Sequence, residues 1–66
     1  MKIKVNGTYE TVNDAVTLLE IITKKGLSPD RVIIEYNKII VTKEELPKIS
    51  PKENDSIEIV AFVGGG

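Results

Sequence analysis

The chain has 66 residues, a formal net charge of −1, and neither cysteine nor histidine. A chain of this length buries only roughly 60% of the surface that its unfolded form exposes, so it has room for one domain with a modest core. Disulfides, thiolate or imidazole metal sites and nucleophile–base pairs built on these residues are excluded. Balanced charge, with two tyrosines and one phenylalanine as the only aromatic residues, argues against nucleic-acid binding.

The first residues predict a β-hairpin. Ile3 and Val5 alternate with lysines, as on a strand with one buried face. Asn6-Gly7 suits a type I′ turn, which needs positive φ at both central residues, and residues 8–11 are expected to return as a second strand. Because the strand pattern starts at once, with no leader and no membrane-length apolar run, we expect a cytoplasmic protein with no membrane partner.

The next segment predicts one amphipathic helix. Thr11, Asn13 and Asp14 are all candidate N-caps, and the sequence does not choose among them. The apolar positions that share one helical face are Ala15, Leu18, Leu19 and Ile22. Gly26 is expected to end the helix in the left-handed conformation, with Leu27 packing back on its last turn.

Residues 31–36 and 39–41 predict a second hairpin that turns at Asn37-Lys38. Glu35 gives the register, because if it faces water then Ile33 shares its face. The positions expected to point to the helix are Val32, Ile34 and Tyr36.

The remainder predicts a long connection and a last strand. Residues 42–55 contain Pro47 and Pro51 and are expected to be mostly irregular, with one possible helical turn at residues 43–46. Residues 56–63 alternate as a strand. Ile57, Ile59 and Ala61 share one face of it, and Glu58, Val60 and Phe62 share the other.

This order of elements predicts an α+β fold. A mixed sheet of about five strands around one amphipathic helix buries the apolar faces of both hairpins, which is the ubiquitin-like β-grasp arrangement. The first and last strands would lie side by side at the centre of the sheet. We expect a single domain over residues 1–66, with a flexible C-terminal glycine tail at residues 64–66.

The tail is the first candidate functional feature. Gly66 has no side chain, so its carboxylate could enter a narrow tunnel in another protein, and Gly65 and Gly64 leave the backbone free to extend. The alternative is a frayed terminus without function. Two acidic groups, Glu44-Glu45 and Glu53 with Asp55, are interpreted as solvated acids and not as a catalytic pair.

A second candidate is an apolar patch on the side of the sheet away from the helix. Ile33, Val60 and Phe62 are expected to lie there with nothing left in so short a chain to cover them. We interpret them as a docking surface for the partner that captures the tail. Scattered surface hydrophobes without function are the alternative.

Residues 55–66, Asp-Ser-Ile-Glu-Ile-Val-Ala-Phe-Val-Gly-Gly-Gly, resemble the closing signature of the ThiS family, the sulfur carriers of thiamin thiazole synthesis. The resemblance extends over nearly the whole chain: residues 3–7 are similar to the family's opening hairpin, Leu18-Leu19 to its helix, and residues 32–37 to its V-x-V-E-x-N strand. The departures are Lys38, Thr42-Lys43 and Asn54, all in turns.

The resemblance implies a carrier and not an enzyme. A ThiF-like adenylyltransferase would use ATP to adenylate the Gly66 carboxylate, and sulfur from cysteine, supplied by a desulfurase, would convert it to a thiocarboxylate. The sulfur would then pass to a ThiG-like thiazole synthase, and the chain would hold no cofactor or metal of its own. All of the catalysis would belong to the partners.

Three other interpretations stay open. A molybdopterin-type carrier (MoaD-like) has a similar fold and tail, but its usual approach to the tail carries prolines where this chain has Ala61-Phe62-Val63. A ubiquitin-like protein modifier would be joined to target lysines through Gly66. An interaction module would use the sheet alone, and its tail would be incidental.

Overall fold

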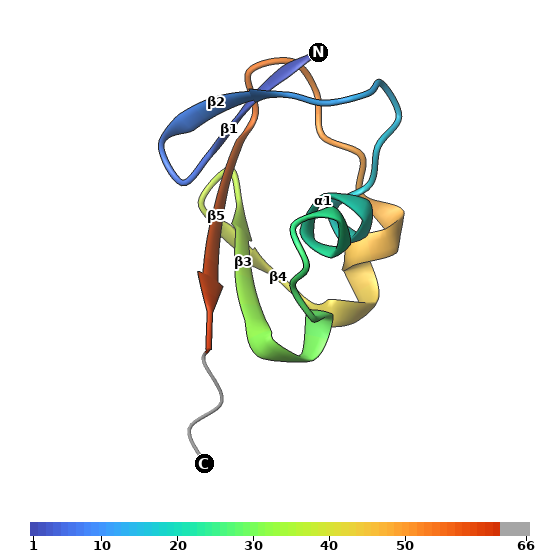
Figure 1. Cartoon of the computed structure of the whole chain (residues 1–66), viewed down its shortest axis with the longest axis vertical. Helices are drawn as coiled ribbons and strands as arrows, with labels where there is room; N and C mark the ends of the chain where they lie inside the picture. The colour runs from blue at the N-terminus through green and yellow to red at the C-terminus, as the bar shows by residue number, and fades with distance from the viewer. Residues whose placement is uncertain (63–66) are drawn as a thin grey trace.

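The structure, a computed structural model, describes residues 1–62 (Figure 1). The strands are β1 (Lys2–Val5), β2 (Thr8–Thr11), β3 (Val32–Tyr36), β4 (Ile39–Val41) and β5 (Ser56–Ala61); the helices are α1 (Leu18–Lys24) and the 3₁₀ helices η1 (Pro29–Arg31) and η2 (Lys43–Lys48). The strand–strand–helix–strand–strand–strand order is therefore confirmed.

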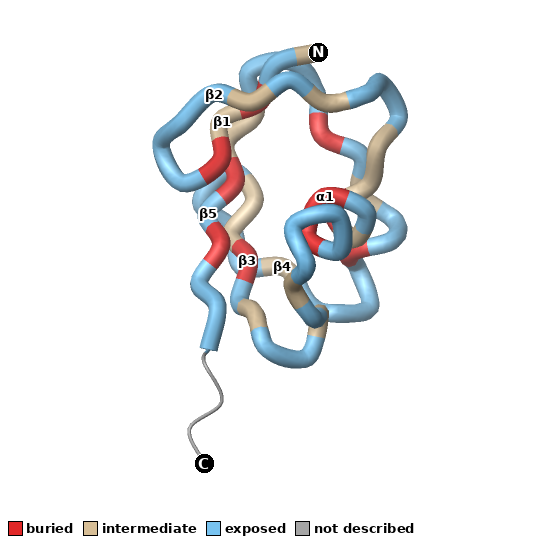
Figure 2. The backbone as a smooth tube through the Cα atoms, in the orientation of Figure 1, coloured by how far each residue is buried: buried red, intermediate tan, exposed pale blue. Residues whose placement is uncertain are grey.

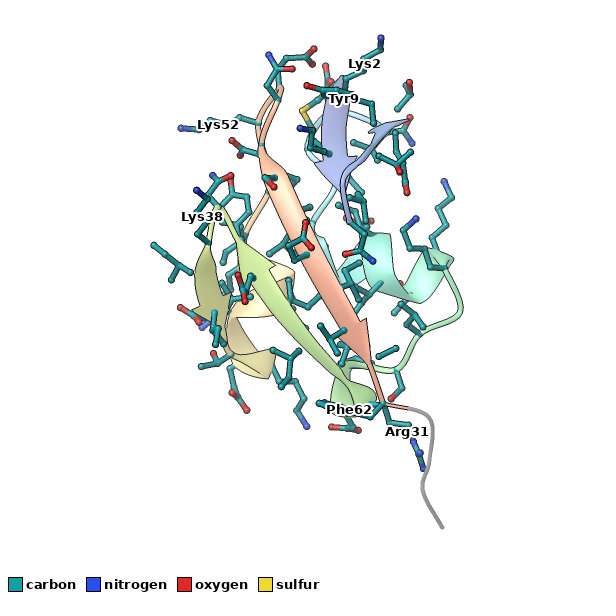
Figure 3. All side chains as sticks on the ribbon, turned by 90° about the vertical axis from the view of Figure 1, so that its left-hand side faces the viewer. Lys2, Tyr9, Arg31, Lys38, Lys52 and Phe62 are labelled. Carbon is teal, nitrogen blue, oxygen red and sulfur yellow. The ribbon has the colours of Figure 1, made fainter. Side chains whose placement is uncertain are left out.

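The strands form one mixed sheet in the order β2-β1-β5-β3-β4. β1 and β5 run parallel, while the other neighbouring pairs are antiparallel. The first and last strands are adjacent, with β5 at the centre, as the sequence predicts. Helix α1 and η2 cover one face of this sheet, and the opposite face is left open by the described part of the chain (Figures 1 and 3).

Both predicted hairpin turns are present. Asn6 and Gly7 have φ of 49° and 83°, and Asn37 and Lys38 have φ of 49° and 72°. Two successive positive φ angles match the right-handed twist of the flanking strands, which is why Asn-Gly is favoured there. Lys38 adopts a conformation that glycine takes without steric cost.

The predicted start of the helix is wrong. Helix α1 begins at Leu18, and its N-cap is Thr17, not Thr11, Asn13 or Asp14. The Thr17 hydroxyl accepts from the Glu20 N–H at 3.1 Å, and the Thr17 N–H donates to Glu20 Oε1 at 2.9 Å. This capping box satisfies two amide groups and fixes the first turn. Ala15, expected on the apolar face of the helix, precedes it with φ of 66°.

The predicted end of the helix is confirmed. Gly26 has φ of 78°, and its N–H donates to the Thr23 carbonyl at 2.9 Å. The Leu27 N–H donates to the Ile22 carbonyl at 3.0 Å, and the Leu27 side chain packs against the core. These two bonds define a Schellman motif.

Two further boundaries differ from the prediction. Arg31 belongs to η1, so β3 starts one residue later. The helical turn expected at residues 43–46 is present, but it continues to Lys48 as the six-residue helix η2, with Pro47 inside it. A short 3₁₀ helix loses at most one backbone bond to a proline. Leu46 of η2 is 2% exposed, so the burial of its side chain holds this segment against the sheet and α1.

The core lies between the sheet and the two helices that cover it (Figure 2). Its buried side chains are Ile3, Val5, Leu18, Ile21, Ile22, Ile34, Leu46, Ile57 and Ile59. Strand alternation predicts the sheet members of this set, whereas Ile21 and Leu46 were not predicted. Ala61, expected on the face of Ile57 and Ile59, is exposed; it pairs with Val32 of β3, but β1 has already ended on its other side. Among residues 1–62, no helix has the length and apolarity needed to span a membrane.

Candidate functional site

The open face of the sheet carries the predicted apolar patch, which consists of Ile33, Val60 and Phe62. Their side chains are 43%, 55% and 53% exposed. Ile33 on β3 and Val60 on β5 are directly opposite each other, and Phe62 follows two residues further along the same chain. The exposure of these residues is confirmed. Their role in docking stays a prediction.

The other predicted site residues, Gly64, Gly65 and Gly66, lie outside the residues that the structure describes. Phe62 is the last described residue, and Figure 3 shows it at one end of the open face, beside Arg31. Its N–H donates to the Arg31 carbonyl at 2.7 Å. The backbone pairing of β5 with the β3 segment thus continues up to four residues before Gly66.

Asn6 secures β5 on its other side. The main chain of β1 turns away after Val5, but the Asn6 amide takes the place of a further residue of that strand. The Ile59 N–H donates to Asn6 Oδ1 at 2.7 Å, and Asn6 Nδ2 donates to the Ile59 carbonyl at 3.2 Å. Side-chain bonds to both backbone groups of Ile59 thus continue the contact between the first hairpin and β5 beyond the end of β1.

The start of β5 is held by a polar cluster around Asp55. The Tyr36 hydroxyl and the Lys52 N–H both donate to Asp55 Oδ2, the latter at 2.7 Å. The Ser56 N–H donates to Asn37 Oδ1 at 2.9 Å. Asp55 therefore organises the loop before β5, so its interpretation as a solvated acid is wrong. Glu53 is exposed, and it accepts a hydrogen bond from the Lys2 N–H at 2.8 Å.

The hydrogen bond between Tyr36 and Asp55 shifts the pKa values of both side chains. Burial and the adjacent Asp55 carboxylate raise the pKa of Tyr36 to about 12. Burial by itself would raise the pKa of Asp55, but the hydrogen bonds from Tyr36 and Lys52 outweigh it, so this pKa lies below its ordinary value. Both shifts favour the tyrosine hydroxyl as donor and the carboxylate as acceptor at neutral pH.

Sequence reasoning missed other exposed apolar side chains. Tyr9, Ile39 and Ile40 are each more than half exposed, and Ile40 on β4 is directly opposite Glu35. The alternation that gives the register of β3 could have placed Ile40 on the open face. Tyr9 lies opposite Lys4, whose ammonium group is 5.3 Å from the centre of the ring.

The hollows of the described surface lie away from the patch. One of about 370 Å³ is lined by residues of β2, the following loop and α1, and another of about 400 Å³ lies beside Asn6, Leu27 and Ile59. Neither is lined by Ile33, Val60 or Phe62. Residues 1–62 contain no group of three or more Asp or Glu side chains that could hold a metal ion. The open face of the sheet around Ile33, Val60 and Phe62 is therefore the main candidate for a functional surface among the described residues.

A five-stranded mixed sheet, with its last strand at the centre and one α-helix across one face, defines a ubiquitin-like β-grasp protein. Residues 3–66 match the sequence model of the ThiS family. The chain belongs to the ThiS family, as its closing residues predict.

Relatives and solved structures agree with this assignment. The sulfur carrier protein ThiS of Bacillus subtilis is 40% identical over 53 residues, which are 80% of each chain. A crystal structure of the thiamine biosynthesis protein ThiS from Geobacter metallireducens superposes with a TM-score of 0.80 at 28% identity and covers 100% of both chains.

A thiazole synthase of Magnetococcus marinus is 35% identical over 66 residues, which are 100% of this chain but 20% of that protein. A thiazole synthase of Paramagnetospirillum magneticum is 32% identical with the same coverage. The chain thus spans about a fifth of the length of these two relatives.

Proposed function

We propose that this chain is a sulfur carrier of thiamin thiazole synthesis and that the carboxylate of Gly66 is the group that carries the sulfur. The proposal is supported by the family match, which extends through residue 66. It is also supported by the composition of these 66 residues, because none of their side chains offers a thiol for carrying sulfur. The proposal applies to the form of the protein that ends at Gly66.

The chemistry requires activation of the carboxylate, which is a poor acyl electrophile. In the proposed cycle the carboxylate attacks the α-phosphorus of ATP on a ThiF-like adenylyltransferase, and pyrophosphate leaves. Persulfide sulfur derived from cysteine by a desulfurase then displaces AMP, which is a good leaving group, and an acyl disulfide forms. A thiol then cleaves the S–S bond of this intermediate, which releases the thiocarboxylate and leaves the thiol oxidised in a disulfide. The carrier contributes its main chain to these steps, and ATP is bound and used by the partner.

The length of the chain between Phe62 and Gly66 limits how far the terminal carboxylate can be from the apolar patch. An extended chain spans at most about 3.3–3.6 Å per residue, so Gly66 lies within about 14 Å of Phe62. An enzyme that holds the Gly66 carboxylate in its active site must therefore contact the end of β5. We propose that Ile33, Val60 and Phe62 form this contact.

The proposed acceptor of the sulfur is a ThiG-like thiazole synthase. The relatives named thiazole synthase contain a region similar to this whole chain, which supports a functional link between the two activities. The cytoplasm is the compartment in which we expect this transfer.

The test is the intact mass of the 66-residue chain after incubation with ATP, a ThiF-like enzyme and a sulfur donor. We expect a mass increase that corresponds to exchange of one oxygen for sulfur, located at Gly66 by fragmentation. The control is a chain that lacks Gly65 and Gly66, which should fold but acquire no sulfur. An unchanged mass, with an enzyme shown to be active on another carrier, would contradict the proposal.

Two further readouts separate the alternatives. Transfer of sulfur to a thiazole synthase, but not to a molybdopterin precursor, distinguishes this carrier from the MoaD-like type. Conjugates of higher mass in cell extracts, lost when Gly66 is deleted, would instead indicate a protein modifier.

A further inference from the structure

Two glutamates face each other on the open face of the sheet. Glu35 on β3 is directly opposite Glu58 on β5, one step along each strand pair from the buried Ile34 and Ile59. Within residues 1–62, neither carboxylate takes part in a hydrogen bond or an ion pair with another side chain. Like charges directly opposite on neighbouring strands destabilise a sheet. Charge repulsion between Glu35 and Glu58 is therefore expected to destabilise the free chain.

The cations of the open face do not neutralise the two glutamates by ion pairing. Lys2, Lys38 and Lys52 lie at the end of the face away from Phe62, and Arg31 lies at the end beside it (Figure 3). Lys4 is on β1, opposite Ser56 of β5, and its ammonium group lies over the Tyr9 ring, 5.3 Å from the ring centre. None of them forms an ion pair with either glutamate. Within residues 1–62 the two carboxylates thus have no ion-pair partner, and Ile33 and Val60 border them on one side.

We propose that the Glu35–Glu58 pair is the charged centre of the surface that docks on the adenylating enzyme. The partner presents a basic side chain, preferably arginine, between the two carboxylates, and its apolar side chains cover Ile33 and Val60. This inference rests on the proposed function. It adds the chemistry by which the partner is recognised.

Both the short distance from Phe62 to Glu58 and the usual area of a protein interface place the two glutamates inside the contact with the enzyme. The enzyme that takes Gly66 must touch the region of Phe62, and Glu58 lies four residues earlier on the same strand, about 13 Å away. A standard interface buries about 800 Å² per partner, an area about 30 Å across, so a contact centred on the patch includes both carboxylates.

A guanidinium placed between the two glutamates changes the sign of the interaction. It replaces like-charge repulsion with two charge-assisted hydrogen bonds, for which the planar, forked donor group of arginine is well suited. Binding of the partner thereby removes the charge repulsion between Glu35 and Glu58 that is present in the free chain. Each glutamate should then oppose stability in the free chain and favour binding in the complex.

The experiment measures both quantities on the same variants. Glu35→Gln and Glu58→Gln are compared with Glu44→Gln, which makes the same charge change at an exposed site on η2. Binding to the adenylating enzyme is measured by calorimetry at low and at high salt, and the Tm of each free chain is recorded. We expect each face variant to bind roughly 10-fold more weakly with less salt dependence, and its Tm to rise by about 1–4 °C. Glu44→Gln should leave affinity unchanged.

Glu58→Lys is the stronger variant. It places a cation opposite Glu35, so the free chain should become more stable while binding is lost, and a raised Tm excludes misfolding as the cause. Unchanged affinity in Glu35→Gln and Glu58→Gln, with the thiocarboxylate still formed on the unaltered chain, overturns this inference and leaves the proposed function intact.

Two other results would also overturn it. A chain that neither binds the enzyme nor acquires sulfur removes the proposed function together with the inference. Self-association of the chain alone, abolished by Glu58→Gln, would assign the surface to a second copy of this chain and not to the enzyme.

Discussion

Asn6 links two parts of the chain that are far apart in sequence. Its left-handed φ opens the first hairpin turn, and its side-chain amide bonds both backbone groups of Ile59. The first property is local, because Asn tolerates this conformation better than most residues. The second property requires the assembled sheet, because Ile59 lies 53 residues away.

We expect Asn6→Ala to lower the free energy of unfolding by roughly 2–3 kcal/mol, the sum of two lost hydrogen bonds and a strained φ. Asn54→Ala is the matched control, since Asn54 has φ of 70° but no side-chain hydrogen bond within residues 1–62. It should lose roughly 1 kcal/mol. Urea unfolding followed by circular dichroism measures both, and equal losses would show that the bonds to Ile59 contribute nothing.

The Tyr36–Asp55 pair predicts a pH dependence at both extremes. The pKa of Asp55 is lowered in the folded chain, so its stabilisation is present above the unfolded value near 4 and is lost as pH falls through the folded pKa. The pKa of Tyr36 is raised to about 12, so its stabilisation is complete below pH 10 and is lost as pH rises through 12.

Tyr36→Phe removes this hydrogen bond. The variant should be less stable at neutral pH, and its urea midpoint should depend less on pH in both windows than that of the unaltered chain. Tyr9→Phe provides the control, because Tyr9 is exposed and pairs with Lys4 rather than with an acid. If both variants keep the same pH dependence as the unaltered chain, the linkage derived from the Tyr36–Asp55 bond is wrong.

At the scale of an element, helix α1 shows that an N-cap can set the start of a helix where the apolar spacing predicts an earlier one. It has seven residues, which is too short to be stable by itself in water. The reciprocal bonds between Thr17 and Glu20 at its start and the Schellman bonds at Gly26 and Leu27 close both ends. Burial of Leu18, Ile21 and Ile22 against the sheet then fixes its orientation.

Thr17→Ala should therefore lower the free energy of unfolding by about 1 kcal/mol, because the Glu20 N–H loses its acceptor. Thr23→Ala, on the same helix, removes only a hydroxyl that donates to the Leu19 carbonyl at 2.9 Å. Since alanine has the higher helix propensity, this control should be neutral or slightly stabilising. Thermal unfolding of the two variants compares them, and an equal loss in both would contradict the role of the cap.

At the scale of the whole molecule, the two faces of the sheet differ in how far their apolar side chains are buried. The face toward α1 and η2 supplies nearly all of the buried apolar surface. On the open face, Ile33 and Val60 are about half exposed. A chain of 66 residues has a stability of roughly 3–10 kcal/mol. A single large cavity on the covered side therefore threatens the entire fold.

We expect Leu46→Ala to lower the free energy of unfolding by roughly 2–5 kcal/mol and to leave a measurable unfolded fraction at 37 °C. Val60→Ala, on the open face, should change the same quantity by less than about 0.5 kcal/mol. Calorimetry and amide exchange measure both. If Leu46→Ala proves as mild as Val60→Ala, η2 is not part of the cooperative core.

Strand alternation, the turn pairs Asn6-Gly7 and Asn37-Lys38 and the helix-ending Gly26 act over a few residues. The local sequence therefore determined the strands, the positions of both hairpin turns and the helix C-terminus, and the closing residues determined the family. The exposure of Ile33, Val60 and Phe62 also followed from alternation. A capping box at Thr17 and Glu20 was present in the sequence too, but the apolar spacing that begins at Ala15 competed with it.

Only the tertiary structure decided which distant groups meet. The bonds from Asn6 to Ile59, the burial of Leu46 and the Tyr36–Asp55 pair each join segments that the folded sheet brings together. The opposition of Glu35 and Glu58 depends on the register between β3 and β5, which no local pattern specifies. Register is a property of two paired strands, so the charged centre of the open face could be located only after the sheet had formed.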